Sequence, residues 1–417
     1  FFEPLPVHDG LPQIDDPTPT TGDERPLTAR SRRYQPIRTL FPRTILPAAL
    51  DLGASAFGGD IGGTLQVTDI LGFHSVVGSA RYQTAFHQPS GSVAYRYSQL
   101  LPTFSLSFGR AYAQRTGYER YNYERPASAE DLGYRVTGYQ ERVTRVTGGV
   151  SVPVLRHPIH NASAGAQYSY TQYTNVDARD PVDPNAPASS TPGTGGLGQV
   201  DFSLTYDNIR AVKFGYASET GRSAGVRLTI IDRHLGGRFG DLQVAGNYTE
   251  RLRMPWRGHQ VLAMNLSGGA AAGGLSNRAA YFVGGYSQQE DVIRTLLMRS
   301  AIGEAGVLRG FQPGAFAGTY YTVLNAEYRI PIADVERGVG TLPLFMRRIT
   351  MIPFSDLGGA WSQGFNRKAL HWGVGAALVL SFKVGYLDAI DLFVQYARGF
   401  DDKYGLDTFR ATVVQSF

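Results

Sequence analysis

The sequence contains no cysteine among its 417 residues. This absence excludes disulfide-stabilised scaffolds and zinc sites with thiolate ligands, and it suits an oxidising compartment in which unpaired thiols would be oxidised. The chain also lacks any run approaching the roughly 18 consecutive apolar residues of a transmembrane helix. Its longest apolar stretch, 372–382, is interrupted by glycine and serine. A membrane protein with this sequence must therefore be a β-barrel, because only helices and closed barrels satisfy their backbone hydrogen bonds in lipid.

Charge is also sparse. Asp, Glu, Lys and Arg make up 18% of the chain, below the usual quarter, and the formal net charge is +5. The basic residues are dispersed without a run or a helical stripe, so we expect no nucleic-acid partner. The sequence has no phosphate-binding P-loop and no dinucleotide fingerprint, and we expect no cofactor. By contrast, the 50 glycines, 22 phenylalanines and 24 tyrosines favour a β-barrel, which uses glycine for strand twist and aromatic residues at the membrane interfaces.

Prolines are concentrated in residues 1–44, which show little periodicity. This composition predicts an extended periplasmic linker over 1–44, followed by a barrel domain over 45–417. The chain opens Phe1-Phe2-Glu3-Pro4 without a methionine or a signal-peptide pattern. We interpret this as a mature or truncated chain and not as evidence for a cytoplasmic protein.

After residue 45 the sequence alternates between apolar and polar residues in short segments. In 200–207, Phe202 and Leu204 share one face, whereas Asp201 and Ser203 lie on the other. The segments 319–329, 370–382 and 390–397 alternate in the same way, which predicts strands with an apolar face toward lipid and a polar face toward a lumen. A soluble β-sandwich also alternates, but its strands average about five or six residues. Many segments here are nearer the ~9–11 residues of a tilted membrane strand.

The alternating segments predict an all-β fold, a transmembrane antiparallel β-barrel of about 16 strands, an even number as in bacterial barrels. The predicted strands are 48–57, 60–70, 73–85, 91–99, 103–115, 134–152, 160–175, 196–208, 221–232, 238–252, 258–272, 319–331, 343–361, 370–384, 388–400 and 408–417. The long connections 116–133, 176–195 and 273–318 all follow odd-numbered strands. Since such barrels have long extracellular loops and short periplasmic turns, both termini are expected in the periplasm.

A short motif lies in the longest of these connections. Leu308-Arg309-Gly310-Phe311 stands just before the twelfth predicted strand, and the thirteenth contains Phe354, Asp356 and Gly358 in a Phe-x-Asp-x-Gly pattern. The tripeptide Arg-Gly-Phe alone is weak evidence, because Arg398-Gly399-Phe400 repeats it. In order and position, however, the two motifs closely resemble the signatures of the sixth extracellular loop and the following strand in the Omp85 superfamily of outer-membrane barrels, of the bacterial surface-antigen type.

This resemblance implies that the loop folds back into the barrel and that Arg309 meets Asp356 inside it. Leu308, Arg309, Gly310, Phe311 and Asp356 would then form a latch that holds the loop against the inner wall. A guanidinium in the lumen needs a carboxylate partner, and arginine suits a two-pronged contact in a way that lysine does not. Gly310 is expected where the loop backbone takes a positive φ or approaches the wall closely.

The two ends of the expected barrel carry further resemblances. The last strand ends in an alternating pattern that includes Phe409, Val413 and Phe417 and resembles the signal read by bacterial barrel-assembly machinery. The predicted first strand, 48–57, is rich in alanine and glycine. In the family, a weak seam between the first and last strands opens so that substrate strands can pair with the exposed edges. Alternatively, these small residues only fill a crowded wall.

The resemblance implies insertion of proteins into the bacterial outer membrane, or their translocation across it. The expected partners are outer-membrane lipid and lipopolysaccharide, substrate outer-membrane proteins, and periplasmic or outer-membrane proteins. Residues 1–44 are too short for the periplasmic POTRA domains usual in the family, and 34–47 resemble the junction that follows a periplasmic β-propeller in surface-antigen barrels. Two alternatives therefore stay open: a pore or secretion channel plugged by 273–318, and a scaffold that anchors a periplasmic domain or complex.

Signals for an enzyme or a metal site are weak. Ser223 lies in a G-x-S-x-G pattern, but a nucleophile elbow requires a strand followed by a helix, and here another alternating segment follows. His157 and His160 flank a predicted turn without a nearby carboxylate cluster, so we expect no metal there. The proline-broken run 177–183 is better interpreted as a solvated loop than as a calcium site. We therefore predict no catalytic residue.

Overall fold

The computed structural model describes most of the chain. The described residues are 34–47, 60–83, 87–119, 136–177, 194–211, 218–256, 258–273, 281–286, 307–312, 314–338, 340, 342, 344–362, 364–365, 367–384 and 388–416. Residues 1–33 of the expected linker, the predicted strand 48–57 and Phe417 lie outside them.

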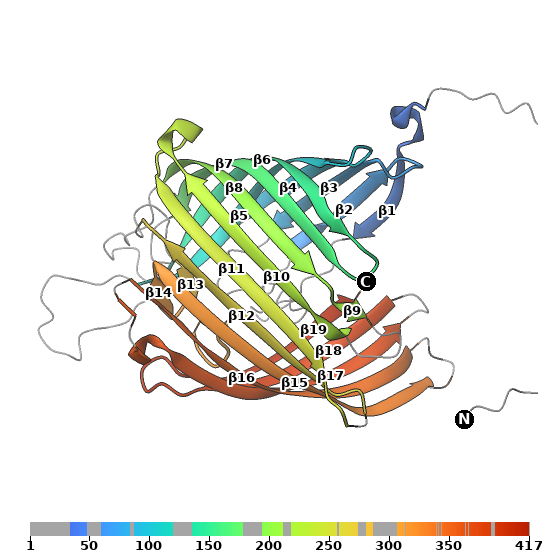
Figure 1. The fold of residues 1–417 in the computed structure, drawn as a ribbon, viewed down its shortest axis with the longest axis vertical. Helices are drawn as coiled ribbons and strands as arrows, with labels where there is room; N and C mark the ends of the chain where they lie inside the picture. Colours follow the sequence, from blue (N-terminus) through green and yellow to red (C-terminus); the bar gives the residue numbers. More distant parts are fainter. Residues whose placement is uncertain are drawn as a thin grey trace, which may run out of the picture.

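Antiparallel strands form almost the whole of the described structure (Figure 1). The strands are β1 (Phe41–Pro47), β2 (Asp60–Thr68), β3 (His74–Gln83), β4 (Gln88–Tyr97), β5 (Thr103–Glu119), β6 (Val136–Arg156), β7 (Asn161–Asp177), β8 (Gly195–Asp207), β9 (Arg210–Ala211), β10 (Ser218–Ile231), β11 (Asp241–Arg253), β12 (Val261–Ala271), β13 (Tyr281–Val283), β14 (Phe316–Gly318), β15 (Tyr320–Gly338), β16 (Leu344–Trp361), β17 (His371–Val384), β18 (Asp388–Gly399) and β19 (Asp407–Ser416). Short 3-10 helices cover Pro36–Thr39, Arg233–Leu235 and Arg367–Ala369. No helix in these described ranges is long and apolar enough to cross a membrane.

The strands follow one another around a curved wall in chain order. Once the two-residue β9 and the separate β13–β14 hairpin are set apart, sixteen of the described strands form one antiparallel meander from β1 to β19. β8 pairs with β10 and β12 pairs with β15, so the short strands interrupt the chain order but not the wall. The prediction of an antiparallel barrel of about 16 strands is confirmed, and the predicted strands from 60–70 onward match β2 to β19 within a few residues at most ends.

The first strand differs from the sequence expectation. β1 occupies Phe41–Pro47 and pairs with β2, so it begins inside the segment expected to be a linker. Pro42 and Pro47 obscured this strand in the sequence, because proline interrupts a hydrogen-bonded ladder and is tolerated mainly in edge strands. The register of β1 shifts between Pro42 and Thr44, at one of these sites.

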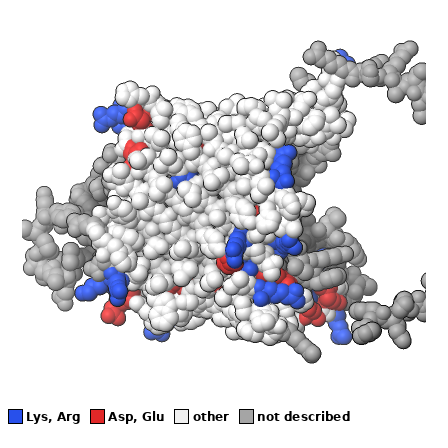
Figure 2. Space-filling view, in the orientation of Figure 1, with Lys and Arg blue, Asp and Glu red and all other residues white. Residues whose placement is uncertain are grey.

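The two faces of the wall differ as the alternation predicted. On the outer face of β8, Phe202 and Leu204 are 47% and 55% exposed. On its inner face, Asp201 is 7% exposed. On β18 the same contrast separates the exposed Tyr396 from the buried Gln395. Figure 2 shows a largely uncharged outer surface, with Lys, Arg, Asp and Glu gathered mainly toward its edges. This is the lipid-out, lumen-in arrangement of a membrane barrel.

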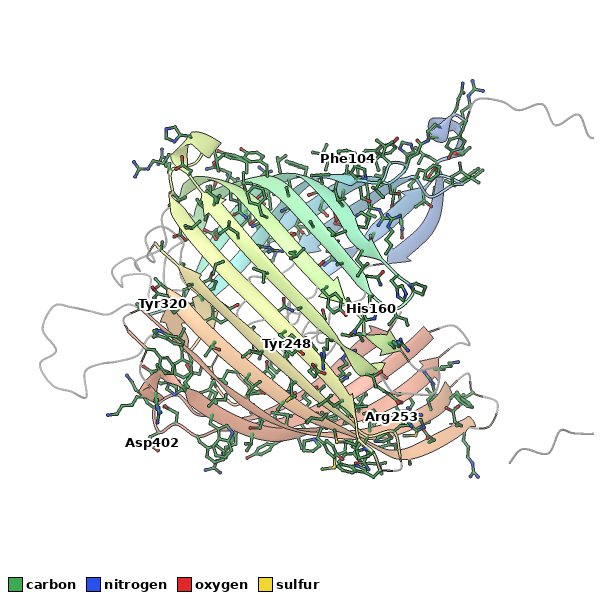
Figure 3. All side chains as sticks on the ribbon, viewed as in Figure 1. Phe104, His160, Tyr248, Arg253, Tyr320 and Asp402 are labelled. Carbon is green, nitrogen blue, oxygen red and sulfur yellow. The ribbon has the colours of Figure 1, made fainter. Side chains whose placement is uncertain are left out.

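The two ends of the wall can be told apart by their connections. His160 and Arg253 flank the short connections 157–160 and 254–260, and Figure 3 shows both toward the same end. Tyr320 and Asp402 lie at the opposite end (Figure 3). We call the end with His160 and Arg253 the turn end and the other the loop end.

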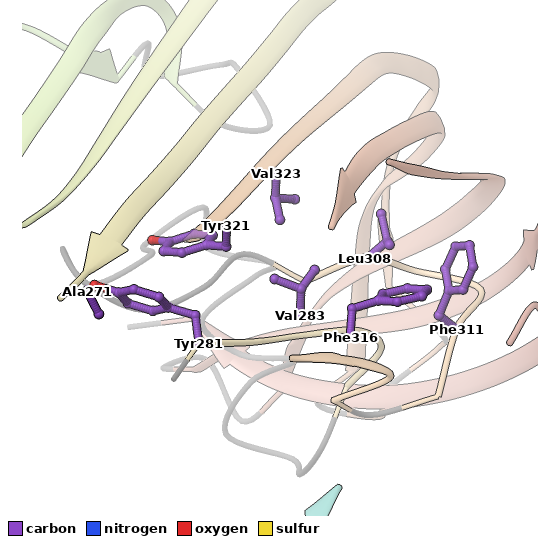
Figure 4. Close-up of a cluster of buried hydrophobic side chains, with 8 residues drawn as sticks. All are labelled: Ala271, Tyr281, Val283, Leu308, Phe311, Phe316, Tyr321 and Val323. Atoms are coloured by element: carbon purple, nitrogen blue, oxygen red, sulfur yellow. The ribbon is translucent and has the colours of Figure 1, made fainter. Parts of the chain in front are cut away.

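The long connection between β12 and β15 lies against the inner wall near the loop end. Its hairpin pairs Tyr281 with Gly318 and Val283 with Phe316. Around this hairpin is the main cluster of buried apolar side chains (Figure 4), consisting of Ala271, Tyr281, Val283, Leu308, Phe311, Phe316, Tyr321 and Val323. The barrel therefore has its core where this loop meets β15, and that contact positions the candidate site.

Candidate functional site

The loop reaches the wall through backbone contacts on both sides of the motif. Val307 forms a parallel bridge with Gly284, and the Leu308 N–H donates to the Gly284 carbonyl at 2.7 Å. The Leu308 side chain is completely buried in the apolar cluster. Burial of a leucine side chain contributes roughly 1.5–3 kcal/mol, so Leu308 anchors the segment that presents Arg309.

Arg309 meets Asp356 of β16 inside the barrel. Its Nε donates to Asp356 Oδ2 at 2.6 Å and its Nη2 to Oδ1 at 2.6 Å, which is a two-pronged contact. The Arg309 backbone N–H adds a third bond to Oδ2 at 3.1 Å. Arg309 is 3% exposed and Asp356 is fully buried, so water screens this pair little. The structure thus brings together the two residues that the resemblance pairs.

A second carboxylate completes the pairing. Arg309 Nη1 donates to Glu327 Oε1 at 2.9 Å, and Arg329 Nη2 donates to Glu327 Oε2 at 3.0 Å. Asn325 donates to Asp356 Oδ1 and to the Val307 carbonyl, both at 2.8 Å. Two arginines and two carboxylates balance to zero net charge, and their shared hydrogen bonds offset the cost of removing them from water.

The strand motif contributes more than its aspartate. The Arg309 guanidinium carbon lies 3.6 Å from the centre of the Phe354 ring, in cation–π geometry. Gly358 lies where β16 passes β15 closely, since a Cβ on it would be 2.7 Å from the Thr322 carbonyl oxygen. Phe354 thus packs its ring against the Arg309 guanidinium, and Gly358 permits the close approach of β16 to β15.

Glycines let the loop backbone lie directly on the wall. Gly310 has a φ of +86°, a conformation that favours glycine. A Cβ on Gly310 would be 2.4 Å from the Gly399 nitrogen, and one on Gly373 would be 2.2 Å from the Arg309 carbonyl oxygen. Gly373 and Gly399 are opposite each other on β17 and β18. The second Arg-Gly-Phe tripeptide is therefore part of the surface on which the first one rests.

An aromatic group covers the motif toward the loop end. Phe311 contacts Phe316 edge-on, with ring centres 5.5 Å apart, and Phe316 stacks on His371 at 3.7 Å. His371 Nδ1 lies 2.9 Å from Asp401 Oδ2 in the β18–β19 turn. Although burial favours the neutral form of Asp401, hydrogen bonds from the backbone N–H groups of Tyr404 and Lys403 and from His371 lower the pKa of this carboxyl below its ordinary value.

The β18–β19 turn is also tied to the loop backbone. The Leu406 N–H donates to the Gly310 carbonyl at 2.8 Å, and Phe311 forms an isolated bridge with Gly405. The loop thus contacts the connection that leads into the last strand. Glu327, Asn325 and this turn were not predicted as parts of the site. Asn325 and Glu327 do alternate on the polar face of β15, and that pattern could have identified them.

The remaining sequence candidates lie elsewhere. Phe409 of β19 is 74% exposed on the outer surface, and Val413 is opposite Leu392 in the same ladder. Ser223 lies within β10, paired with Thr249 and Asp207. His160 contacts the Tyr206 hydroxyl, 2.7 Å from its Nδ1. Of the run 177–183, only Asp177 lies among the described residues.

Chemically, the candidate site is a closed set of ion pairs and packed rings. Within the residues the structure describes, no group of three or more His, Asp or Glu side chains is placed to hold a metal ion. The site's hydrogen bonds join loop to wall, and its two carboxylates are both occupied by guanidinium groups. Such an arrangement can hold or release a segment of chain.

Comparison with known proteins places the fold. No protein-family model matches the sequence, and no curated protein matches it. Among solved structures, the chain is similar to BamA from Haemophilus ducreyi lacking POTRA domains 1–3, with a TM-score of 0.53 and 15% identity over 86% of this chain and 69% of that one. It is also similar to CdiB from Escherichia coli, with a TM-score of 0.56 and 10% identity over 86% of this chain and 60% of that one. At these identities the likeness is one of fold.

Proposed function

Because this chain has the fold of an Omp85-type barrel, we propose that it inserts proteins into the bacterial outer membrane, or translocates them across it, at the seam between β1 and β19. Both termini would face the periplasm, with outer-membrane lipid and lipopolysaccharide around the wall. Residues 1–40, the part of the expected linker that precedes β1, would link the barrel to periplasmic or outer-membrane partner proteins. No cofactor is required, because strand pairing at an exposed edge supplies the interaction with substrate.

The observation that carries this proposal is the state of the two end strands. β1 pairs with β2 and β19 pairs with β18, and no pairing between β1 and β19 is found among the described residues. An edge strand presents unpaired N–H and C=O groups, and these are a template for another strand. A substrate strand that added to β1 or β19 would gain main-chain hydrogen bonds without a dedicated side-chain site.

We further propose that Arg309 and its partners act as a latch, with Leu308, Gly310, Phe311 and Asp356. The loop contacts β15 to β18 and the turn that leads into β19. Holding the loop against these strands would keep this half of the barrel rigid while the seam moves. The latch is therefore a conformational element of the proposed function and takes no part in covalent chemistry.

A disulfide across the seam tests the proposal, and the absence of native cysteine makes the design clean. Single cysteines across 41–47 are combined with single cysteines across 408–411, and pairs that oxidise in living cells are selected. The matched control joins Ser79 and Ser92, whose hydroxyl oxygens lie 2.7 Å apart on the continuous wall between β3 and β4. Both staples join two strands of the wall, but only the first closes the seam.

The readout is the level of folded outer-membrane or surface proteins that depend on this chain, before and after a reductant. We expect the seam staple to abolish that dependence until reduction restores it, and the Ser79–Ser92 staple to leave it intact. If a fully oxidised seam staple left the dependent proteins unchanged, the seam would serve only as a wall and the proposal would be wrong.

A pore or secretion channel is the second candidate, favoured by the position of the loop. Residues 281–286 and 307–312 lie against inward-facing residues of the wall, as the contacts of Tyr286 with Gln395 and of Arg309 with Asp356 show. A loop in this position would plug a channel until released. Single-channel conductance of the purified chain, raised by Arg309→Ala, would favour the pore. Stable co-purification with an outer-membrane complex, without conductance, would favour a scaffold.

A further inference from the structure

A second cluster of charge lies on the inner wall, beyond the latch toward the turn end. Inward-facing residues of β11, β12 and β15 are aligned in rows by the strand register. Thr249, Asn265 and Asn325 form the row beside the latch. The next row contains Arg251, Ala263 and Glu327, and the following row contains Arg253, Val261 and Arg329. Arg251 is thus directly opposite Ala263, whereas Arg329 lies one row further along and is diagonal to Ala263.

Both arginines are deeply buried. Arg251 is 9% exposed and Arg329 is 6% exposed. Each presents an Nε–H that has no acceptor among the described residues. Arg329 uses one other donor on Glu327, whereas the described part of the chain offers Arg251 no hydrogen bond or ion pair. Since a guanidinium carries five N–H donors, this pair has more unused donors than the latch arginine.

Charge balance separates Arg251 from the latch. Arg309 and Arg329 are matched by Asp356 and Glu327, so the latch group is neutral. Arg251 adds a third positive charge to this part of the wall, within electrostatic range of Arg329. Asp207 and Glu327 are the carboxylates within range of Arg251, and neither bonds to it. Two like charges buried within electrostatic range of each other oppose folding unless an anion lies between them.

We propose that Arg251 and Arg329 form an oxyanion-binding subsite in the barrel lumen, which takes a single carboxylate or phosphate group between the two guanidinium groups. The planar fork of arginine matches both oxyanions. Ala263, directly opposite Arg251 and diagonal to Arg329, has the smallest side chain in these three rows. The subsite adjoins the latch and shares Glu327 with it through Arg329, whereas Arg309 and Asp356 pair with each other.

The subsite is tested on the purified full chain, folded in detergent micelles, by isothermal titration at constant ionic strength. Inorganic phosphate and acetate are titrated separately against a chloride background, so that the two sources of oxyanion are distinguished. We expect saturable binding of at least one of them at one site per chain. Arg251→Gln and Arg329→Gln should each weaken that binding about tenfold or more, because each removes one fork from a buried charge pair.

The matched control is Arg253→Gln. Arg253 is on the same strand, two residues along, but its side chain is half exposed and lies 3.5 Å from Glu219. The substitution Arg253→Gln removes one positive charge near the turn end, as Arg251→Gln does, and should leave the oxyanion affinity unchanged. If Arg251→Gln does not fold, Arg251→Lys serves instead, since it keeps the charge and loses the fork. Equal responses to phosphate, acetate and chloride, or equal losses in Arg253→Gln and Arg251→Gln, would overturn the proposal. The assay uses no substrate protein, so its outcome is independent of the seam experiment.

Discussion

Gly310 of the loop lies directly against Gly399 of β18, with no space for a side chain on either residue. A Cβ on Gly399 would be 2.2 Å from the Gly310 carbonyl oxygen, and one on Gly310 would be 2.4 Å from the Gly399 nitrogen. Each glycine is the centre of an Arg-Gly-Phe tripeptide. The two copies therefore differ in role: one carries the buried arginine, and the other provides the flat backbone on which it is placed.

Gly399→Ala should displace the loop. The added methyl group would overlap the Gly310 carbonyl, and overpacking of this kind typically costs about 1–3 kcal/mol. We expect a lower thermal stability and faster cleavage of 284–318 by an added protease. Gly78→Ala on β3 is the control, because a Cβ there meets nothing within 4 Å. Equal protease resistance of the two variants would contradict close packing of the loop on β18.

Arg309→Ala should free the loop more completely. It leaves the buried carboxylates Asp356 and Glu327 without their shared partner, and breaking a buried ion pair on one side typically costs about 3–5 kcal/mol. The matched control is Arg398→Ala in the second tripeptide, whose side chain is 59% exposed and whose distance to Asp407 is 3.9 Å. An exposed pair contributes about 0–1 kcal/mol, so this variant should melt close to the parent chain.

The measurement for both arginine variants is heat denaturation of the micelle-folded chain, together with proteolysis of the loop. Arg309→Lys is an informative third variant, since it retains the charge but cannot contact both Asp356 oxygens as Arg309 does. We expect it to fall between the parent chain and Arg309→Ala. If all three variants kept a protease-resistant loop, Arg309 would not hold the loop against the wall and the latch proposal would be wrong.

The β18–β19 turn should become less stable in acid. In the folded chain, the pKa of Asp401 lies below the ordinary aspartate value of 3.8. Because the folded pKa is the lower one, the stabilisation is present above the unfolded pKa and is lost as the pH falls through the folded pKa. We therefore expect the turn to loosen below about pH 4. Protease cleavage within 400–406 between pH 2.5 and pH 7 would measure it.

Asp401→Asn separates this effect from general acid denaturation. The amide cannot carry the charge that favours the bonds from His371 and from the Lys403 and Tyr404 N–H groups. The turn of this variant should be more open at neutral pH and show a weaker acid transition. Asp402→Asn, at the exposed neighbouring position, should behave as the parent chain does. The idea fails if both variants share one acid profile.

Alternation predicted most of the wall because it has a direct physical cause. Lipid and lumen impose opposite polarities on successive residues of a strand. The sequence alone therefore predicts that Phe202 lies on the outer face and Asp201 on the inner face. The first strand, β1, was not predicted because Pro42 and Pro47 interrupt this alternation. The hairpin Tyr281–Val283 with Phe316–Gly318 escaped because three-residue strands carry too short a pattern to be distinguished from a loop.

The site was predictable only where a motif carried it. Arg309 and Asp356 could be paired through their resemblance to known signatures, whereas the contact of Glu327 with Arg309 depends on how far the loop descends along β15. Likewise, the role of Gly399 depends on the register that places it opposite Gly373. Such positions follow from three-dimensional packing, which a two-residue period does not encode.

The two faces of a single strand provide the sharpest test of the membrane assignment. On β5, Leu106 is 57% exposed on the outer surface, and Ser107 follows it on the inner face. An arginine on the lipid face of a barrel costs about 2–4 kcal/mol at the bilayer midplane, whereas a lumenal arginine remains in a polar environment. Leu106→Arg should therefore reduce folding into lipid vesicles strongly, and Ser107→Arg should not. Folding in detergent micelles, where the outer face meets a thinner and more adaptable layer, should differ less between the two variants. If Leu106→Arg and Ser107→Arg folded equally well into vesicles, the outer face of β5 would not be in contact with lipid.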